Sequence, residues 1–169
     1  MLLLILVTQI SDEVSWDLVD FAIVGALLIG AGLIYGLAAR KTGNFVYRTA
    51  FIVALATAFI LVWGNVAVGI IGEEGNPANL MYLGVLAVGF IGAIIARFQP
   101  HGMARALFAT ALAQSLVAVI ALIAELGSPL SGPGEILILN GFFIVLWIGS
   151  ALLFRRTSAT GSKLNQELE

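Results

Sequence analysis

The chain has 169 residues, of which 60% are hydrophobic and only 11% are charged. This composition excludes an ordinary soluble domain, because too few polar side chains remain to cover a surface exposed to water. The net charge of -2 indicates little by itself. The lack of cysteine in the sequence excludes disulfides, thiolate metal ligands and thiol nucleophiles.

The opening segment, residues 1–10, is apolar but too short to cross a bilayer. It lacks the basic start and the small-residue cleavage site of a signal peptide, and acidic residues follow it closely. We therefore expect it to remain on the protein as an interfacial helix on the outer leaflet. A re-entrant or spanning arrangement is the alternative.

Five longer apolar stretches follow, each close to the roughly 20 residues with which an α-helix crosses about 30 Å of hydrocarbon. They cover residues 18–39, 49–71, 80–96, 103–124 and 136–154. The pairs Asn76-Pro77 and Gly132-Pro133 predict helix starts before the third and fifth stretches, since proline at the first helical position loses no hydrogen bond. The sequence therefore predicts an all-α integral membrane protein, built as a bundle of five transmembrane helices.

The distribution of charge predicts the direction of these crossings. All eight basic residues lie in or beside every second gap between the stretches, counting the C-terminal tail as a gap, and eight of the ten acidic residues lie at the other gaps. Short cytoplasmic loops retain Lys and Arg, so we expect the N-terminus outside and the C-terminus inside. Residues 1–156 then form one transmembrane domain. The polar residues 157–169 are expected to be a flexible cytoplasmic tail.

A shift of 57 positions places part of the sequence on a second, similar part. Arg40 falls on Arg97 and Arg48 on Arg105, and both copies read A-R-x7-R-x2-F-x2-A-L-A across a basic loop. Because this shift contains two crossings, it predicts two parallel helical hairpins followed by a fifth helix. The alternative is that both loops obey the same charge bias and that the remaining matches are coincidence.

Small residues recur at a spacing of four in the first and third stretches. They are Gly32 and Gly36, which the shift matches to Gly89 and Ala93. Small side chains let two helices approach closely in lipid, where no hydrophobic drive holds helices together. Packing within the bundle is the favoured interpretation, and a dimerisation seam is the alternative.

Three uncharged polar residues lie within the apolar stretches, where an unsatisfied polar group is costly. Asn65, Gln114 and Asn140 belong to the second, fourth and fifth stretches. They are candidates for a polar pocket between those helices. Hydrogen bonding between helices is the alternative and the commoner use of such residues.

Ionisable residues mark ion pathways inside membranes, and the apolar stretches contain few of them. Asp20, near the start of the first stretch, is a candidate for an outer ion contact, although the helix dipole also favours an acid there. The single histidine, His101, lies in a loop and neither lysine lies in a stretch, which disfavours haem ligation and a retinal Schiff base. We expect no catalytic residue, metal site or cofactor, and hence no enzyme.

Two functions remain open on this basis. The favoured one is a structural or accessory membrane module that forms a homo-oligomer or joins another membrane protein. The alternative is a transporter or binding protein for a small neutral or lipophilic compound, with Asn65, Gln114 and Asn140 as its pocket. The lipid bilayer is the expected partner in both cases, and a nucleic acid is not. Size and hydropathy are typical of small polytopic proteins of the bacterial inner membrane, which is the expected location.

Overall fold

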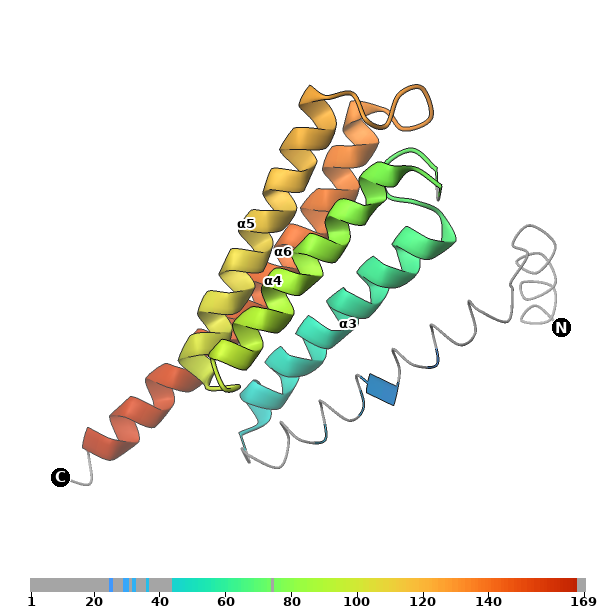
Figure 1. Ribbon diagram of the computed structural model, residues 1–169. Helices are drawn as coiled ribbons and strands as arrows, with labels where there is room; N and C mark the ends of the chain where they lie inside the picture. Colours follow the sequence, from blue (N-terminus) through green and yellow to red (C-terminus); the bar gives the residue numbers. More distant parts are fainter. Residues whose placement is uncertain are drawn as a thin grey trace, which may run out of the picture.

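The computed structural model describes residues 44–73 and 75–166, with side chains as far as Ser158, together with five single positions before them. These five positions are helical: Gly25, Ile29, Gly30, Gly32 and Gly36. Over the described ranges the chain forms helices and no strand (Figure 1). The helices are α3 (Phe45–Ala67), the 3-10 helix η1 (Pro77–Leu80), α4 (Met81–Ile95), α5 (Pro100–Ile123) and α6 (Pro133–Gln166).

Four helical segments are long and apolar enough to cross a membrane. They are α3, η1 joined with α4, α5, and the part of α6 over Pro133–Ser158. These segments overlap the expected second to fifth stretches, so the prediction of a helical bundle whose helices are long and apolar enough to cross a membrane is confirmed. The segment 1–10 and Asp20 lie outside the described residues, as does the stretch 18–39 apart from the five single positions. The total of five crossings therefore stays a prediction.

The bounds of α3 differ from those expected from hydropathy. The helix begins at Phe45 rather than at residue 49, because the side chain of Asn44 accepts a hydrogen bond from the amide of Val46 at 2.9 Å and caps the first turn. It ends at Ala67 rather than at residue 71. Ile70 and Ile71 are apolar and buried, but they lie in the loop that follows. Hydropathy does not separate such buried loop residues from helical ones.

The predicted helix starts at proline are confirmed. Asn76 caps η1, since its side-chain oxygen accepts a hydrogen bond from the amide of Ala78 at 2.9 Å and Pro77 is the first helical residue. Pro133 opens α6 directly after Gly132. Pro100 opens α5 in the same way, although the expected stretch begins only at residue 103. Proline fixes a φ angle suited to the first turn and has no amide to leave unpaired there.

α6 continues to Gln166, well past the expected end at residue 154. The hydroxyls of Thr157 and Ser158 donate to the carbonyl of Phe154 at 2.7 and 3.3 Å. Extending an existing helix needs no new nucleus, so polar residues can add turns to it at little cost. The backbone is therefore helical over most of the segment for which a flexible tail was expected.

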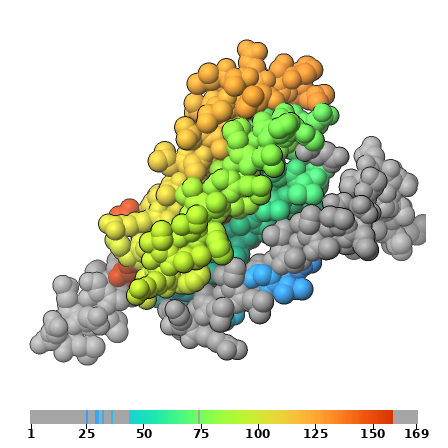
Figure 2. Space-filling view, in the orientation of Figure 1, coloured from blue at the N-terminus to red at the C-terminus, as the bar shows by residue number. Residues whose placement is uncertain are grey.

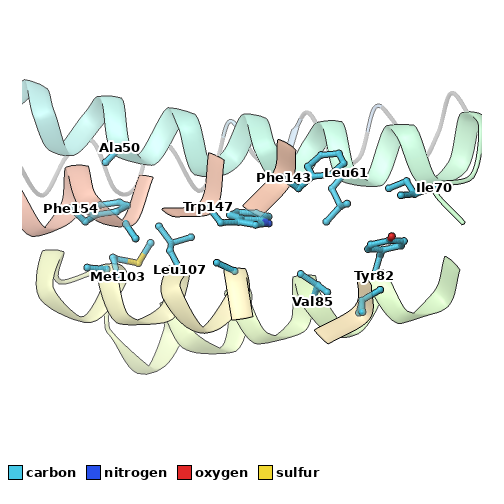
Figure 3. Packing of buried hydrophobic residues seen from close by; sticks show 14 of the residues in the cluster. Ala50, Leu61, Ile70, Tyr82, Val85, Met103, Leu107, Phe143, Trp147 and Phe154 are labelled. Atoms are coloured by element: carbon cyan, nitrogen blue, oxygen red, sulfur yellow. The ribbon is translucent and has the colours of Figure 1, made fainter. Parts of the chain in front are cut away.

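α6 packs along both α5 and α3, and α4 packs along α5, whereas α3 and α4 contact each other much less (Figure 1). Buried side chains of α6, among them Phe143, Trp147 and Phe154, lie between α3 and residues of α5 such as Leu107 (Figure 3). α3 is thus joined to the rest of the bundle mainly through α6.

Glycines bring α4 and α5 close together. A Cβ atom added at Gly92 would lie 2.7 Å from the Cβ of Ala106, closer than real Cβ contacts come, and one at Gly89 would lie 3.1 Å from Oγ1 of Thr110. The turn between the two helices holds Arg97 and Phe98 at φ 48° and 58°. Residues other than glycine adopt such angles infrequently, so this turn is held by its surroundings.

Aromatic rings surround this turn and define what we call the Phe98 end of the bundle. The Tyr47 hydroxyl donates to the Phe98 carbonyl at 2.8 Å. The ring of Tyr47 meets that of Phe154 edge to face, with centroids 5.2 Å apart, and Phe51 lies 6.4 Å from Phe154 in the same manner. Such pairs are worth roughly 1 kcal/mol beyond the area they bury. They join α3, α6 and the α4–α5 turn.

Candidate functional site

Gln114 and Asn140 hydrogen bond to each other in the buried contact between α5 and α6. Gln114 Nε2 donates to Asn140 Oδ1 at 2.8 Å, and the hydroxyl of Tyr82 on α4 donates to the same oxygen at 3.1 Å. Asn140 Nδ2 donates to the carbonyl of Ile136 at 2.9 Å. Gln114 and Asn140 are 0% and 1% exposed. This network is closed to its surroundings and joins three helices.

Asn65, the third predicted pocket residue, makes a different contact. Its Nδ2 donates to the backbone carbonyl of Asn79 at 3.0 Å, which ties α3 to η1. The structure thus brings together two of the three residues and gives the third its own partner. A shared polar pocket stays a prediction, while these bonds favour hydrogen bonding between helices.

Three buried side-chain polar atoms have no hydrogen-bond partner within the described part of the chain. They are Asn65 Oδ1, Gln114 Oε1 and Trp147 Nε1. An unpaired buried polar atom costs about 1–3 kcal/mol.

Asparagine side chains also organise the loop between α3 and η1, which we call the Asn79 end of the bundle. Asn79 Oδ1 accepts from the amides of Ile70 and Ile71 at 3.2 and 2.9 Å, and its Nδ2 donates to the carbonyl of Glu73 at 2.8 Å. Asn79 is 4% exposed. One buried side-chain amide therefore pairs with three backbone groups of this loop, as buried backbone groups require partners.

The same loop is bonded to the loop between α5 and α6. Asn76 Nδ2 donates to the carbonyl of Leu126 at 2.8 Å, and the amide of Gly72 donates to Oγ of Ser131 at 3.2 Å. Gly72 has φ 73° and its missing Cβ leaves room for Nδ2 of Asn76, 2.9 Å from where a Cβ would stand. The two loops form one hydrogen-bonded cap over this end of the bundle.

An apolar groove of about 500 Å³ lies between α3 and α4. Both helices lie on the face shown in Figure 2. One wall includes Leu55, Ala58 and Val62 of α3, and the other includes Ala87 and Phe90 of α4. The groove exists because α3 and α4 do not pack tightly against each other.

Leu107 and Thr110 of α5 and Trp147 of α6 form the floor of the groove. Thr110 is the polar residue there, and its hydroxyl already donates to the carbonyl of Ala106 at 2.9 Å. The groove thus offers a ligand mainly a surface for dispersion contacts, and the unpaired donor of this floor, Trp147 Nε1, is itself buried. None of Asn65, Gln114 and Asn140 lines it.

Small residues line both walls of the groove, Ala54 and Ala58 on α3 and Ala87 and Ala93 on α4. Ala93 was expected at a helix contact and lies on the groove, whereas its neighbour Gly89 both lines the groove and contacts α5. A row of small residues predicts close packing or a hollow equally well, so periodicity alone does not distinguish them.

Gly32, Gly36 and His101, which the sequence analysis also singled out, do not line this groove. A Cβ added at Gly32 or Gly36 would meet no heavy atom within 4 Å. His101 is exposed in the first turn of α5. In the described ranges, no three His, Cys, Asp or Glu side chains cluster closely enough to hold a metal ion.

The described residues thus form a helical bundle, with four segments long and apolar enough to cross a membrane and an apolar groove between two of them. Comparison of the chain with models of protein families, with curated proteins and with solved structures finds no match.

Proposed function

We propose that this protein is a non-catalytic helical module of the bacterial inner membrane, and that its α3–α4 groove holds one lipophilic molecule from the bilayer, such as a lipid acyl chain. In this proposal the chain crosses the membrane five times, with its N-terminus outside and its C-terminus inside. The observation that carries the proposal is the apolar groove between α3 and α4.

The size and lining of the groove support a lipophilic ligand. Its volume of about 500 Å³ falls within the roughly 300–1,000 Å³ that is usual for small-molecule sites. The lining residues on α3 extend from Phe51 to Val62, a length of roughly 16 Å at 1.5 Å per helical residue. A polar compound would lose its hydration there for few hydrogen bonds in return, because Trp147 Nε1 is the one unpaired side-chain donor among the described lining residues, and this exchange is unfavourable.

The hydrogen bonds of the buried side-chain amides also favour a lipophilic ligand over a neutral polar one. Gln114 and Asn140 bond to each other and to Tyr82, so their polar groups serve the contact between helices. Asn65 serves the α3–η1 contact. A neutral polar compound would have to displace these bonds, whereas an acyl chain needs none of them.

Photolabelling tests the proposal. The full chain is placed in lipid nanodiscs that contain a phospholipid with a photoactivatable group in its tail, and labelled residues are mapped by mass spectrometry. We expect label to concentrate on groove residues such as Ala58 and Ala87. The substitution Ala58→Trp fills the groove and should lower this labelling at least fivefold.

Ala56→Trp is the matched control, since Ala56 lies on the same helix but is exposed and does not line the groove. It should leave groove labelling unchanged. The proposal is wrong if label spreads equally over the exposed Leu112 and Leu116 of α5 and over the groove, and if Ala58→Trp has no effect. That pattern is what lipid surrounding any membrane protein would give.

A further inference from the structure

The charged residues that the structure describes are divided between the two ends of the bundle. The acids Glu73, Glu125 and Glu135 are exposed in or beside the loops of the Asn79 end. The described arginines are exposed at or near the Phe98 end, and they are Arg48, Arg97, Arg105, Arg155 and Arg156. Among the described residues, one end of the bundle is therefore acidic and the other is basic. In the proposed topology the basic end faces the cytoplasm.

The apolar groove reaches the basic end of the bundle. Phe98, in the turn after α4, lines the groove together with Met103. Met103 lies at the same end of the buried core as Phe154 (Figure 3). On α3 the lining stops at Val62, and Asn65 then joins α3 to η1 by its bond to a backbone carbonyl. A ligand in the groove therefore has arginines near one of its ends and no described arginine or lysine near the other.

Two of the arginines lie beside the walls of the groove. Arg97 immediately precedes Phe98, which lines the groove. Arg48 lies three residues before the lining residue Phe51, a spacing that places both on the same side of α3. Since α3 and α4 form the two walls, one arginine lies just beyond the lining residues of each wall.

A hydrogen bond fixes the backbone positions of these two arginines relative to each other. The Tyr47 hydroxyl donates to the carbonyl of Phe98 at 2.8 Å, and these two residues are the chain neighbours of Arg48 and Arg97. The Arg97 amide also donates to the carbonyl of Ile94 at 2.9 Å. The two positions are thus held together by the fold, and a ligand that binds both arginines does not have to order the backbone.

Arg105 has the same charge and lies near the same end, but it lies away from the groove. The lining residues Met103, Leu107 and Thr110 share one side of α5 by their spacing. Arg105 follows Met103 by two residues, which places it about 200° around the helix. A general attraction to a negative membrane surface involves Arg97 and Arg105 alike, whereas binding at the groove involves only Arg97.

We propose that the occupant of the groove is an anionic phospholipid of the inner leaflet, with one acyl chain in the groove and its headgroup held by Arg48 and Arg97. This inference rests on the proposed function and adds the class of headgroup. A guanidinium group donates two parallel hydrogen bonds to a phosphate. The ammonium group of a zwitterionic lipid cancels the charge of its phosphate, so two arginines favour a lipid with net negative charge.

The positions of the arginines along the bundle fit this arrangement. Arg48 lies three residues beyond Phe51, about 4.5 Å farther along the helix axis at 1.5 Å per residue. The headgroup of a phospholipid lies just outside the hydrocarbon that holds its chains, so its partners must lie just beyond the apolar lining. Arginine can lay its apolar stem along such a surface and keep its guanidinium group at the level of the headgroups.

Photolabelling with two headgroups tests the inference. The full chain is placed in nanodiscs of phosphatidylcholine that contain a small fraction of a probe, either phosphatidylglycerol or phosphatidylcholine, with the same photoactivatable tail. Label on the groove residues Ala58 and Ala87 is measured relative to label on the exposed Leu112 and Leu116 of α5. We expect this ratio to be about fivefold higher for the phosphatidylglycerol probe, because two arginines near the membrane surface attract its charge.

Substitutions at the two arginines separate binding at the groove from general attraction. Arg97→Gln should lower the advantage of the phosphatidylglycerol probe by about threefold, since one of the two charges beside the groove is lost. Arg97→Lys retains the charge and should restore most of the advantage. Arg105→Gln is the matched control and should leave the advantage unchanged, because Arg105 lies on the other side of α5.

A competition measurement on the unaltered chain guards against a variant with a damaged turn. Excess unlabelled phosphatidylglycerol should displace the phosphatidylglycerol probe from the groove, and an equal excess of phosphatidylcholine should displace much less of it. Equal displacement by both lipids would overturn the inference.

Two further outcomes would overturn the inference. The first is equal labelling of the groove by both probes, in which case the groove still holds lipid and the proposed function stands. The second is an equal loss of advantage in Arg97→Gln and Arg105→Gln, which would indicate attraction to the whole basic end. If neither probe labels the groove above Leu112 and Leu116, the proposed function fails and this inference fails with it.

Discussion

The two ends of the described bundle are held by different interactions. At the Asn79 end, asparagine side chains bond to backbone amides and carbonyls of two irregular loops. At the Phe98 end, the rings of Tyr47, Phe51 and Phe154 pack around a tight turn. Each end contains buried side chains, yet one is held by amide hydrogen bonds and the other by contacts between rings.

The difference follows from the backbone at each end. The loop after α3 is long and buries Ile70 and Ile71, so its amides need partners that helices would otherwise supply. The turn between α4 and α5 is short, and most of its amides continue the bonding of the helices, as in Ala96 to Gly92 and Gln99 to Ala96. Apolar shape then decides how tightly the helices pack. The two ends should respond to different substitutions.

The largest expected effect is at the Phe98 end. Phe154 is 0% exposed and contacts two other rings, so Phe154→Ala leaves a cavity that the neighbouring helices fill only in part. We expect the free energy of unfolding to fall by about 3 kcal/mol. Unfolding of the purified chain in one detergent, followed by circular dichroism against denaturant, measures it. Phe154→Leu retains most of the volume and should cost less than half as much.

An equal loss from both substitutions would show that volume is not what Phe154 contributes. A further control is Phe142→Ala, because Phe142 lies on the same helix but is 51% exposed. It should change the free energy of unfolding by less than about 1 kcal/mol, since little packing is lost at an exposed position.

At the Asn79 end the expected effect is smaller. Asn79→Ala leaves the buried amides of Ile70 and Ile71 without an acceptor, which should cost about 2 kcal/mol. The loop should also become sensitive to protease, because its turn is no longer fixed. The matched control is Asn44→Ala, which removes one acceptor from the amide of Val46 and should cost about 1 kcal/mol. Protease sensitivity that rises equally in both variants would contradict this role of Asn79.

The sequence predicts the helices of this protein better than their contacts. Apolar length and the prolines at Pro77 and Pro133 predict where helices lie, because both act along the chain. Ile70 and Ile71 misplace the end of α3, since an apolar residue in a buried loop has the same hydropathy as one in a helix. Hydropathy also misplaces the end of α6. The helix continues past residue 154 because polar residues can extend a helix that already exists.

The sequence predicts the contacts of the candidate site residues even less well than the bounds of the helices. Polarity alone identified Gln114 and Asn140, and the structure pairs them. It did not reveal that Asn65 would bond to Asn79 instead, because that contact depends on how the loop folds back. The groove was missed altogether. Whether Ala58 and Ala87 meet or leave a hollow depends on the angle between two helices, which small residues permit but do not specify.

The smallest expected effect concerns the amide network that lies nearer the Asn79 end. Asn140→Leu removes the oxygen to which Tyr82 and Gln114 both donate. Hydrogen bonds between side chains in membrane proteins are worth about 0.6 kcal/mol on average and up to about 1.7. We therefore expect a loss of about 1 kcal/mol in the unfolding free energy.

Gln114→Leu should cost less than Asn140→Leu, although it breaks the same bond. It removes the unpaired Gln114 Oε1 together with the donor, and it leaves Asn140 still bonded to Tyr82 and to the carbonyl of Ile136. In the double variant the two losses should fail to add by about 0.5 kcal/mol, since the bond between the two residues is lost only once. A double-mutant cycle in the same detergent measures this difference. Strict additivity, or a larger loss from Gln114→Leu, would mean that this pair holds α5 to α6 by shape and not by its hydrogen bond.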